Sequence, residues 1–146
     1  MLRLRQTGQE IEVIEPKEEM RQSLLSPTKP LFATIGGGHN EYKLQMRDFA
    51  SQKILWTQSI PTYSFTESFS PDGRFLAVAN NEWSPTRTAS SIGVYDAQTG
   101  TLVATIPTGK YQIRKLAFSP DTEYIASGLA DTTILKWKLS DFKESQ

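Results

Sequence analysis

The segment LAFSPDTEYIASGLADTTILKWKLSD, from Leu116 to Asp141, carries the pattern that decides the fold. Alternating apolar residues before Ser119-Pro120 predict a half-buried strand. The proline then removes a backbone donor and favours a turn. A further strand is expected from Thr133 to Leu139. The segment therefore predicts short strands that are joined by tight turns.

The same pattern occurs twice more towards the N-terminus. It is found in TESFSPDGRFLAVAN from Thr66 and in RQSLLSPTKPLFATI from Arg21, beside KLAFSPDTEYIASGL from Lys115. The Ser-Pro steps are 44 and 49 residues apart, and an alanine follows each serine by seven residues; the positions are Ser26, Ser70 and Ser119, with Ala33, Ala77 and Ala126. Spacing of about 40 to 50 residues is typical of repeated four-stranded units.

The middle repeat shows the physical reasons for the pattern most clearly. Asp72-Gly73 suits a turn in which φ becomes positive. The next strand, Phe75 to Ala79, is almost continuously apolar, as expected of a strand covered on both faces. Third strands are expected at Tyr42 to Arg47 and Ser91 to Tyr95, and a fourth at Leu102 to Ile106. Because no stretch has helical periodicity, the sequence predicts an all-β fold.

The segment from Leu116 to Asp141 resembles a WD repeat, through Ser-Pro-Asp, Ala-Ser-Gly, Asp131 and Trp137. The middle repeat resembles it too. The resemblance implies a partial β-propeller of four-stranded antiparallel blades with strands a to d, WD-repeat-like and without a cofactor. It also implies a structural network of Trp137, Ser127 and Asp131, in which Trp137 is well buried. The family's fourth member, a histidine near Gly109 and Lys110, is absent.

The two earlier repeats depart further from the family pattern. Val78 and Tyr95 stand at the Ser and Trp positions of the second repeat, and Thr34 and Arg47 stand there in the first. Neither repeat can build the full network, so stacking of apolar faces is expected to stabilise them.

The repeats define the expected domain organisation of one partial propeller. Residues 1–19 form a half blade with strands c and d, residues 20–59 and 60–108 form two blades, and residues 109–146 form an incomplete blade with strands a, b and c. A closed ring needs at least four blades. The chain by itself is therefore short of a ring.

Composition narrows the classes of partner and of chemistry. Sixteen basic and sixteen acidic side chains cancel, which disfavours nucleic acid and anionic membrane surfaces as partners. The absence of cysteine excludes disulfides, thiolate metal sites and thiol nucleophiles. The polar N-terminal segment shows no secretion signal and the chain has no apolar run long enough to span a bilayer. A cytoplasmic location is expected by default.

Three polar features could suggest chemistry, and each has a simpler explanation. His39, the single histidine, follows three glycines, but the spacing fits no phosphate-binding motif and no second metal ligand is near. The charged residues at 15–19 alternate in sign, as in a solvated loop. Glu67 replaces the Leu116 of the last repeat and is expected to line the central channel as a hydrated carboxylate. No catalytic group and no metal site is identified, so the chain is not expected to be an enzyme.

The long loop from Asn80 to Ser91 is the strongest candidate for partner binding. It contains Trp83 and Arg87, residue types that are enriched at interface hot spots. The alternative is that Trp83 folds over the edge of its own blade. In WD-repeat propellers the b–c and d–a loops share one face, which would gather the candidate residues His39, Asn40, Trp83, Arg87, Lys110 and Tyr111.

These features favour a protein-protein interaction scaffold that binds another protein through the b–c and d–a loop face. The alternative is one lobe of a propeller enzyme or sensor whose remaining parts are absent from this chain. A third possibility is a gene remnant that does not fold alone. A homodimer that closes a ring is also possible, because two sets of three blades make six. The sequence identifies neither the partner nor the pathway.

Overall fold

The computed structural model of the chain describes residues 2–6, 9–14, 20–38, 41–60, 66–81 and 89–143. These residues form thirteen strands and one short 3-10 helix, η1 (Leu139–Asp141). The strands are β1 (Leu2–Gln6), β2 (Gln9–Ile14), β3 (Met20–Leu25), β4 (Leu31–Gly38), β5 (Glu41–Asp48), β6 (Ile54–Ile60), β7 (Glu67–Phe69), β8 (Phe75–Asn81), β9 (Ser90–Asp96), β10 (Leu102–Gly109), β11 (Ile113–Phe118), β12 (Tyr124–Leu129) and β13 (Ile134–Lys138).

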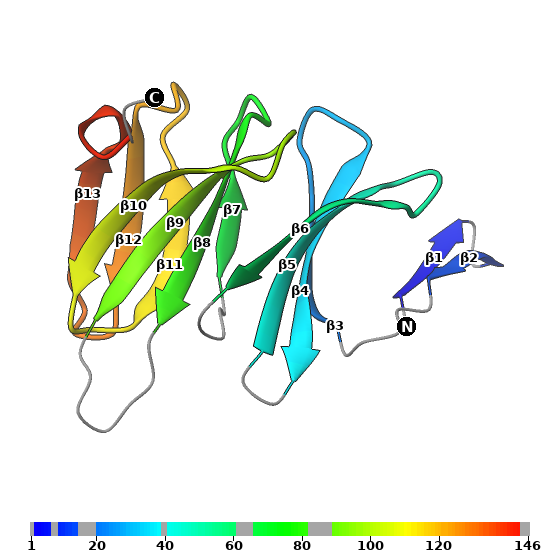
Figure 1. Cartoon of the computed structure of the whole chain (residues 1–146), viewed down its shortest axis with the longest axis horizontal. Helices are drawn as coiled ribbons and strands as arrows, with labels where there is room; N and C mark the ends of the chain where they lie inside the picture. Colours follow the sequence, from blue (N-terminus) through cyan, green and yellow to red (C-terminus); the bar gives the residue numbers. More distant parts are fainter. Residues whose placement is uncertain are drawn as a thin grey trace.

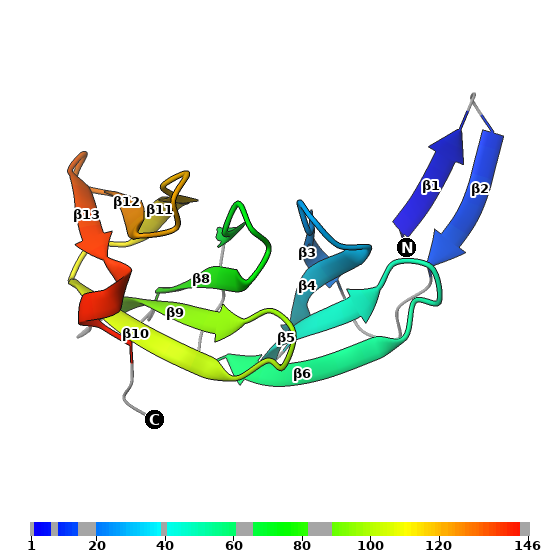
Figure 2. The same cartoon turned by 90° about the horizontal axis from the view of Figure 1, so that it is seen from above.

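The strands form four antiparallel sheets (Figure 1). β1 and β2 make a hairpin, β3 to β6 and β7 to β10 make two four-stranded sheets, and β11 to β13 make a three-stranded sheet. Seen from above, the three larger sheets fan out along an arc, with β3 and β11 on its concave side and β6 and β10 on its convex side (Figure 2). The fold is all-β, a partial propeller of stacked blades. We call the three larger sheets blade 1, blade 2 and blade 3.

The Ser-Pro-Asp segments form the same turn in blades 2 and 3. The Ser70 hydroxyl donates to Asp72 Oδ1 at 2.6 Å and accepts from the Phe75 backbone N–H at 3.0 Å. The Ser119 hydroxyl likewise donates to Asp121 Oδ1 at 2.6 Å and accepts from the Tyr124 N–H at 2.9 Å. Each turn thus satisfies a backbone donor that would otherwise lack a partner. As predicted, Gly73 adopts a positive φ, of 75°.

Blades 1 and 2 pack through one apolar cluster. Ile35, Leu44 and Met46 of blade 1 are fully buried against Leu76 and Val78 of blade 2. Strand residues alternate between the two faces of a sheet, so every second residue of β8 points to blade 1. The apolar continuity of Phe75 to Ala79 arises because the intervening residues point to blade 3.

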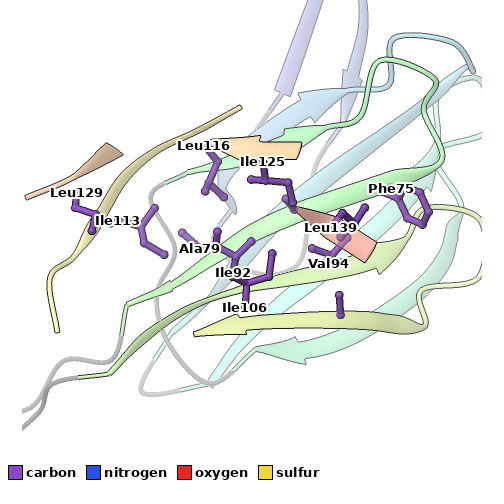
Figure 3. Close-up of a cluster of buried hydrophobic side chains, with 12 residues drawn as sticks. Phe75, Ala79, Ile92, Val94, Ile106, Ile113, Leu116, Ile125, Leu129 and Leu139 are labelled. Atoms are coloured by element: carbon purple, nitrogen blue, oxygen red, sulfur yellow. The ribbon is translucent and has the colours of Figure 1, made fainter. Parts of the chain in front are cut away.

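Blades 2 and 3 pack through a second cluster. Figure 3 shows Ala79, Ile92 and Ile106 of blade 2 beside Ile113 and Ile125 of blade 3. The apolar area buried between the sheets stabilises the stack, because a single sheet has no cover for its two faces.

Two sequence expectations were wrong in detail. The long loop of blade 2 is shorter than expected, since Asn80 pairs with Ser91 and Asn81 pairs with Ser90 in the β8–β9 ladder. Trp137 is half-buried rather than well buried. Within the part of the chain that the structure describes, β13 is the edge strand of a three-stranded sheet, so no fourth strand covers its outer side.

Candidate functional site

The connection between β10 and β11 displays two of the predicted site residues. Lys110 and Tyr111 are both exposed, and the Lys110 ammonium lies 5.1 Å from the centre of the Tyr111 ring. Gly109, with a φ of 99°, turns the chain just before them. The Ala130 N–H donates to the Gln112 carbonyl at 2.9 Å, which fixes this connection beside the β12–β13 turn. A d–a connection and a b–c turn therefore lie next to each other.

Asp131 lies in that β12–β13 turn and shapes it. Its Oδ1 atom accepts from the Thr133 hydroxyl at 2.6 Å and from the Thr133 N–H at 3.1 Å. These hydrogen bonds hold the pKa of Asp131 below its usual value, and the positive charge of Lys110 lowers it further. Lys110 is thus the charged neighbour of Asp131 in space. It stands near the position at which the WD-repeat pattern has a histidine.

Trp137 and Ser127 are joined across β13 and β12. The Trp137 Nε1–H donates to the Ser127 hydroxyl at 2.9 Å, and Ser127 is fully buried. Asp131 bonds within its own turn, as described above. The pair therefore ties the edge strand to the middle strand of blade 3.

Asn81 supports the base of the β8–β9 loop. Its side-chain amide donates to the Ile113 carbonyl at 3.1 Å, and its Oδ1 accepts from the Ile113 N–H at 2.8 Å. Asn81 is buried, and Ile113 begins β11 just after Lys110 and Tyr111. The loop base of blade 2 is therefore fixed to the connection that carries those two residues. Sequence reasoning missed this role because Asn81 was assigned to the loop.

The other four candidates, His39, Asn40, Trp83 and Arg87, lie outside the described residues, as does the charged segment 15–19. The structure brings together Lys110, Tyr111 and Asp131 and leaves the remaining placement of the loop face as a prediction.

Glu67 and Trp56 are two further residues that bear on function or stability. The expectation of a hydrated Glu67 carboxylate was wrong for its Oε2 atom, which is buried and has no hydrogen-bond partner. Trp56 went unnoticed in the sequence; its Nε1–H donates to the Ala97 carbonyl of blade 2 at 2.9 Å. An aromatic residue in an expected fourth strand was the only available signal.

The described ranges hold neither a metal-binding cluster nor a helix that could span a membrane. They contain no group of three or more His, Cys, Asp or Glu residues that could hold a metal ion. Within the same ranges, no helix has the length and apolar character needed to cross a membrane.

The C-terminal part of the chain is similar to a known family. Residues 100–138 match the family model described as WD domain, G-beta repeat. The matched range covers β10 to β13, and so includes Lys110, Tyr111, Ser127, Asp131 and Trp137. No curated protein matches the chain. The sequence match and the stacked antiparallel sheets agree: residues 100–138 match a WD repeat, within a chain whose described residues have the fold of a partial propeller.

Proposed function

We propose that this protein is an interaction scaffold that binds another protein through the face formed by its b–c and d–a loops. The observation that carries the proposal is the exposed Lys110–Tyr111 pair, which is held in place by the hydrogen bonds of the next two residues, Gln112 and Ile113. Tyrosine on a rigid frame is an effective interface anchor, because little conformational entropy is lost on binding.

The family supports this proposal in general terms. WD repeats generally mediate protein-protein interactions and generally serve as scaffolds without catalytic activity. The identity of the partner does not follow from the fold. Trp83, Arg87, His39 and Asn40 belong to the proposed face by their position in the loops of the repeats.

Affinity capture with matched variants tests the proposed face. Lys110→Ala with Tyr111→Ala, and separately Trp83→Ala with Arg87→Ala, should each reduce the recovery of the partner at least fivefold at unchanged thermal stability. Lys53→Ala with Gln98→Ala is the control, because both residues are exposed in c–d turns on the opposite side. Equal recovery by the loop-face variants and the control would contradict the proposal.

Three further proposals complete this picture. We place the repeat boundaries near residues 19, 59 and 108, in line with the strands that each sheet contains. We propose that the protein contacts neither nucleic acid nor membranes, from its balanced charge, and separately that its location is cytoplasmic. Cell fractionation tests the location, and gel-shift and vesicle sedimentation assays test the two excluded partners.

A homodimer that closes a six-bladed ring is a separate proposal. In it, β2 of one copy pairs with β13 of the other. β1 pairs with β2 from Leu2 with Ile14 to Gln6 with Gln9, so β1 would have to leave this ladder. Light scattering after size exclusion should show a discrete dimer that deletion of residues 9–14 abolishes. A stable monomer would contradict ring closure.

A further inference from the structure

The interface between blades 1 and 2 changes from apolar to polar towards the concave side of the arc. Gln22 pairs with Ile35, and Glu67 pairs with Val78; both of these apolar partners belong to the cluster between the two blades. Directly paired residues of antiparallel strands point to the same face of the sheet. Asn80, two residues beyond Val78, also points there. Three polar side chains therefore enter the interface from β3, β7 and β8.

In each of these three side chains, one oxygen atom is buried and has no hydrogen-bond donor among the described residues. The atoms are Gln22 Oε1, Glu67 Oε2 and Asn80 Oδ1. Buried polar atoms in native proteins are nearly always paired, and each exception calls for an explanation. Gln22 Oε1 and Asn80 Oδ1 only accept hydrogen bonds, and Glu67 Oε2 likewise only accepts them when the carboxyl group is ionised. All three atoms therefore lack a hydrogen-bond donor from the described residues.

Two of these three residues, Gln22 and Glu67, line one pocket that is open to solvent. It has a volume of about 230 Å³ and is lined by Gln22, Ser23, Leu24, Thr66, Glu67 and Lys115. The lining residues come from or adjoin the first strands of all three blades, β3, β7 and β11. One water molecule takes up about 30 Å³ of liquid, so the space exceeds the needs of a single bridging water.

The negative charge of the Glu67 carboxylate is not balanced by a positive charge from the described residues around the cavity. Burial raises the pKa of Glu67 to about 7, and no basic group of the described chain offsets this effect. Lys115 lines the cavity from β11, yet it makes no ion pair with Glu67 that would lower the pKa. On β3, the lining residues Gln22, Ser23 and Leu24 carry no charge. Among the described side chains, the carboxyl group therefore has no positive partner.

We propose that this cavity binds a cationic group that carries N–H donors, a guanidinium or a primary ammonium. Both oxygens are buried in the unbound protein, so side-chain rotations would have to turn them towards the pocket. Glu67 Oε2 would then accept a charge-assisted hydrogen bond, and Gln22 Oε1 would accept a second bond from the same group. The cation satisfies both orphaned oxygens and supplies the missing charge. This group belongs either to a free small molecule or to an arginine or lysine side chain of a protein partner.

The inference goes beyond the proposed loop face, because it uses none of the residues on which that proposal depends. Cation binding requires the ionised form of Glu67, so affinity should rise with pH and level off above about pH 7. Replacement of Lys115 by Met removes a like charge from the cavity wall and should strengthen binding.

An NMR titration of the full chain at pH 7.5 tests the inference. Ethylguanidinium and n-butylammonium are the probes, and tetramethylammonium, which has the same charge but no N–H donor, is the control. Backbone amides at 22–24 and 66–68 should shift saturably with the two probes only. Glu67→Gln should weaken binding at least tenfold. Glu67→Leu, which copies Leu116 at the equivalent position of blade 3, should abolish binding in a folded protein.

Two further measurements identify the source of the cation and separate this inference from the proposed loop face. An acetylated Gly-Arg-Gly amide that binds as tightly as ethylguanidinium identifies a partner's side chain as the ligand, and binding of the free cations alone identifies a small molecule. The Lys110→Ala with Tyr111→Ala variant should titrate like the parent, so a failure of the loop face leaves this result intact. Equal binding by the parent and Glu67→Gln, a response to tetramethylammonium, or a rise of a full unit in the measured pKa of Glu67 in Lys115→Met would overturn the inference.

Discussion

Asn81 binds the backbone of Ile113 through both atoms of its side-chain amide, in the manner of a neighbouring strand. This bidentate contact joins β8 of blade 2 to β11 of blade 3 at the end where the candidate binding loops emerge. The equivalent position in blade 3 is Ala130, whose backbone N–H bonds to the Gln112 carbonyl. Asn81 adds a connection through its side chain. The other repeats cannot make this connection, because they have no amide side chain at the equivalent position.

Replacement of Asn81 by Ala should destabilise the fold by about 2 to 3 kcal/mol, since it leaves the N–H and C=O of buried Ile113 without partners. Asn81→Asp should cost a similar amount, because a carboxylate cannot donate to the carbonyl. Urea unfolding measures both. Asn80→Ala is the matched control and should cost less than 1 kcal/mol, because its Oδ1 already lacks a partner. Equal losses of unfolding free energy at Asn81 and Asn80 would show that the contact between Asn81 and Ile113 does not stabilise the fold.

Gly100 meets Trp56 across the interface of blades 1 and 2. Its φ is 78°, and a Cβ atom there would lie 2.6 Å from the Trp56 ring. Gly100→Ala should therefore lower the free energy of unfolding by about 2 to 4 kcal/mol, through backbone strain and collision together. Gly109→Ala separates the two effects, because Gly109 has a φ of 99° and no atom near its Cβ position. It should cost only about 1 kcal/mol. Chemical denaturation measures the unfolding free energy of both variants. Equal losses would show that a collision with Trp56 adds nothing to the backbone strain.

Thr122 is strained in the position that glycine occupies in blade 2. Its φ is 65°, and it lies three residues after Ser119 as Gly73 lies three after Ser70. A β-branched residue is disfavoured in this conformation. We expect Thr122→Gly to stabilise the protein by about 0.5 to 1 kcal/mol in thermal unfolding. The reverse exchange, Gly73→Thr, should be clearly destabilising. A lower melting temperature for Thr122→Gly would contradict this account.

Trp137 contributes to the stability of blade 3 through one hydrogen bond and through the packing of its half-buried side chain. Trp137→Ala should cost about 2 kcal/mol, below the usual range for a fully buried tryptophan, because β13 is an edge strand. Trp137→Phe should retain most of the packing but lose the donor to fully buried Ser127, at a cost of about 1 kcal/mol. Unchanged midpoints for both variants would mean that this pair does not stabilise blade 3.

The repeat made the fold predictable, whereas the contacts between repeats were hidden. Ser-Pro-Asp, the apolar strand after it and the glycine of Asp72-Gly73 are local signals, and each led to the strand or turn that the structure contains. Their physics lies within a few residues of chain. The burial of Glu67 instead depends on Gln22 and Leu24, about 40 residues away, which no local pattern relates to it.

The candidate site was predictable to a similar extent. Lys110 and Tyr111 follow the strand that ends at Gly109, so their exposure on a connection could be inferred from strand length. Asn81 could not be recognised, because an asparagine next to a polar loop looks the same whether it bonds to solvent or to another strand. Only the packing of blade 3 against blade 2 brings Ile113 within its reach.

Glu67 should give the stability of the protein an unusual dependence on pH. Its pKa is raised by burial from 4.5 to about 7, so the folded protein binds the proton more tightly than the unfolded chain. Stability should therefore fall as pH rises from about 4.5 to 7, by on the order of 3 kcal/mol, and stay low above pH 7. Asp72, Asp121 and Asp131 act in the opposite sense, because hydrogen bonds lower their pKa below 3.8 and their contribution is lost only in stronger acid. We expect maximum stability near pH 5 in urea unfolding at fixed ionic strength. Glu67→Gln should flatten the decline between pH 5 and 7 and leave the loss in acid unchanged. A parent protein with constant stability from pH 5 to 8, or a Glu67→Gln variant with the same decline as the parent, would show that the carboxyl group is not held in a buried site.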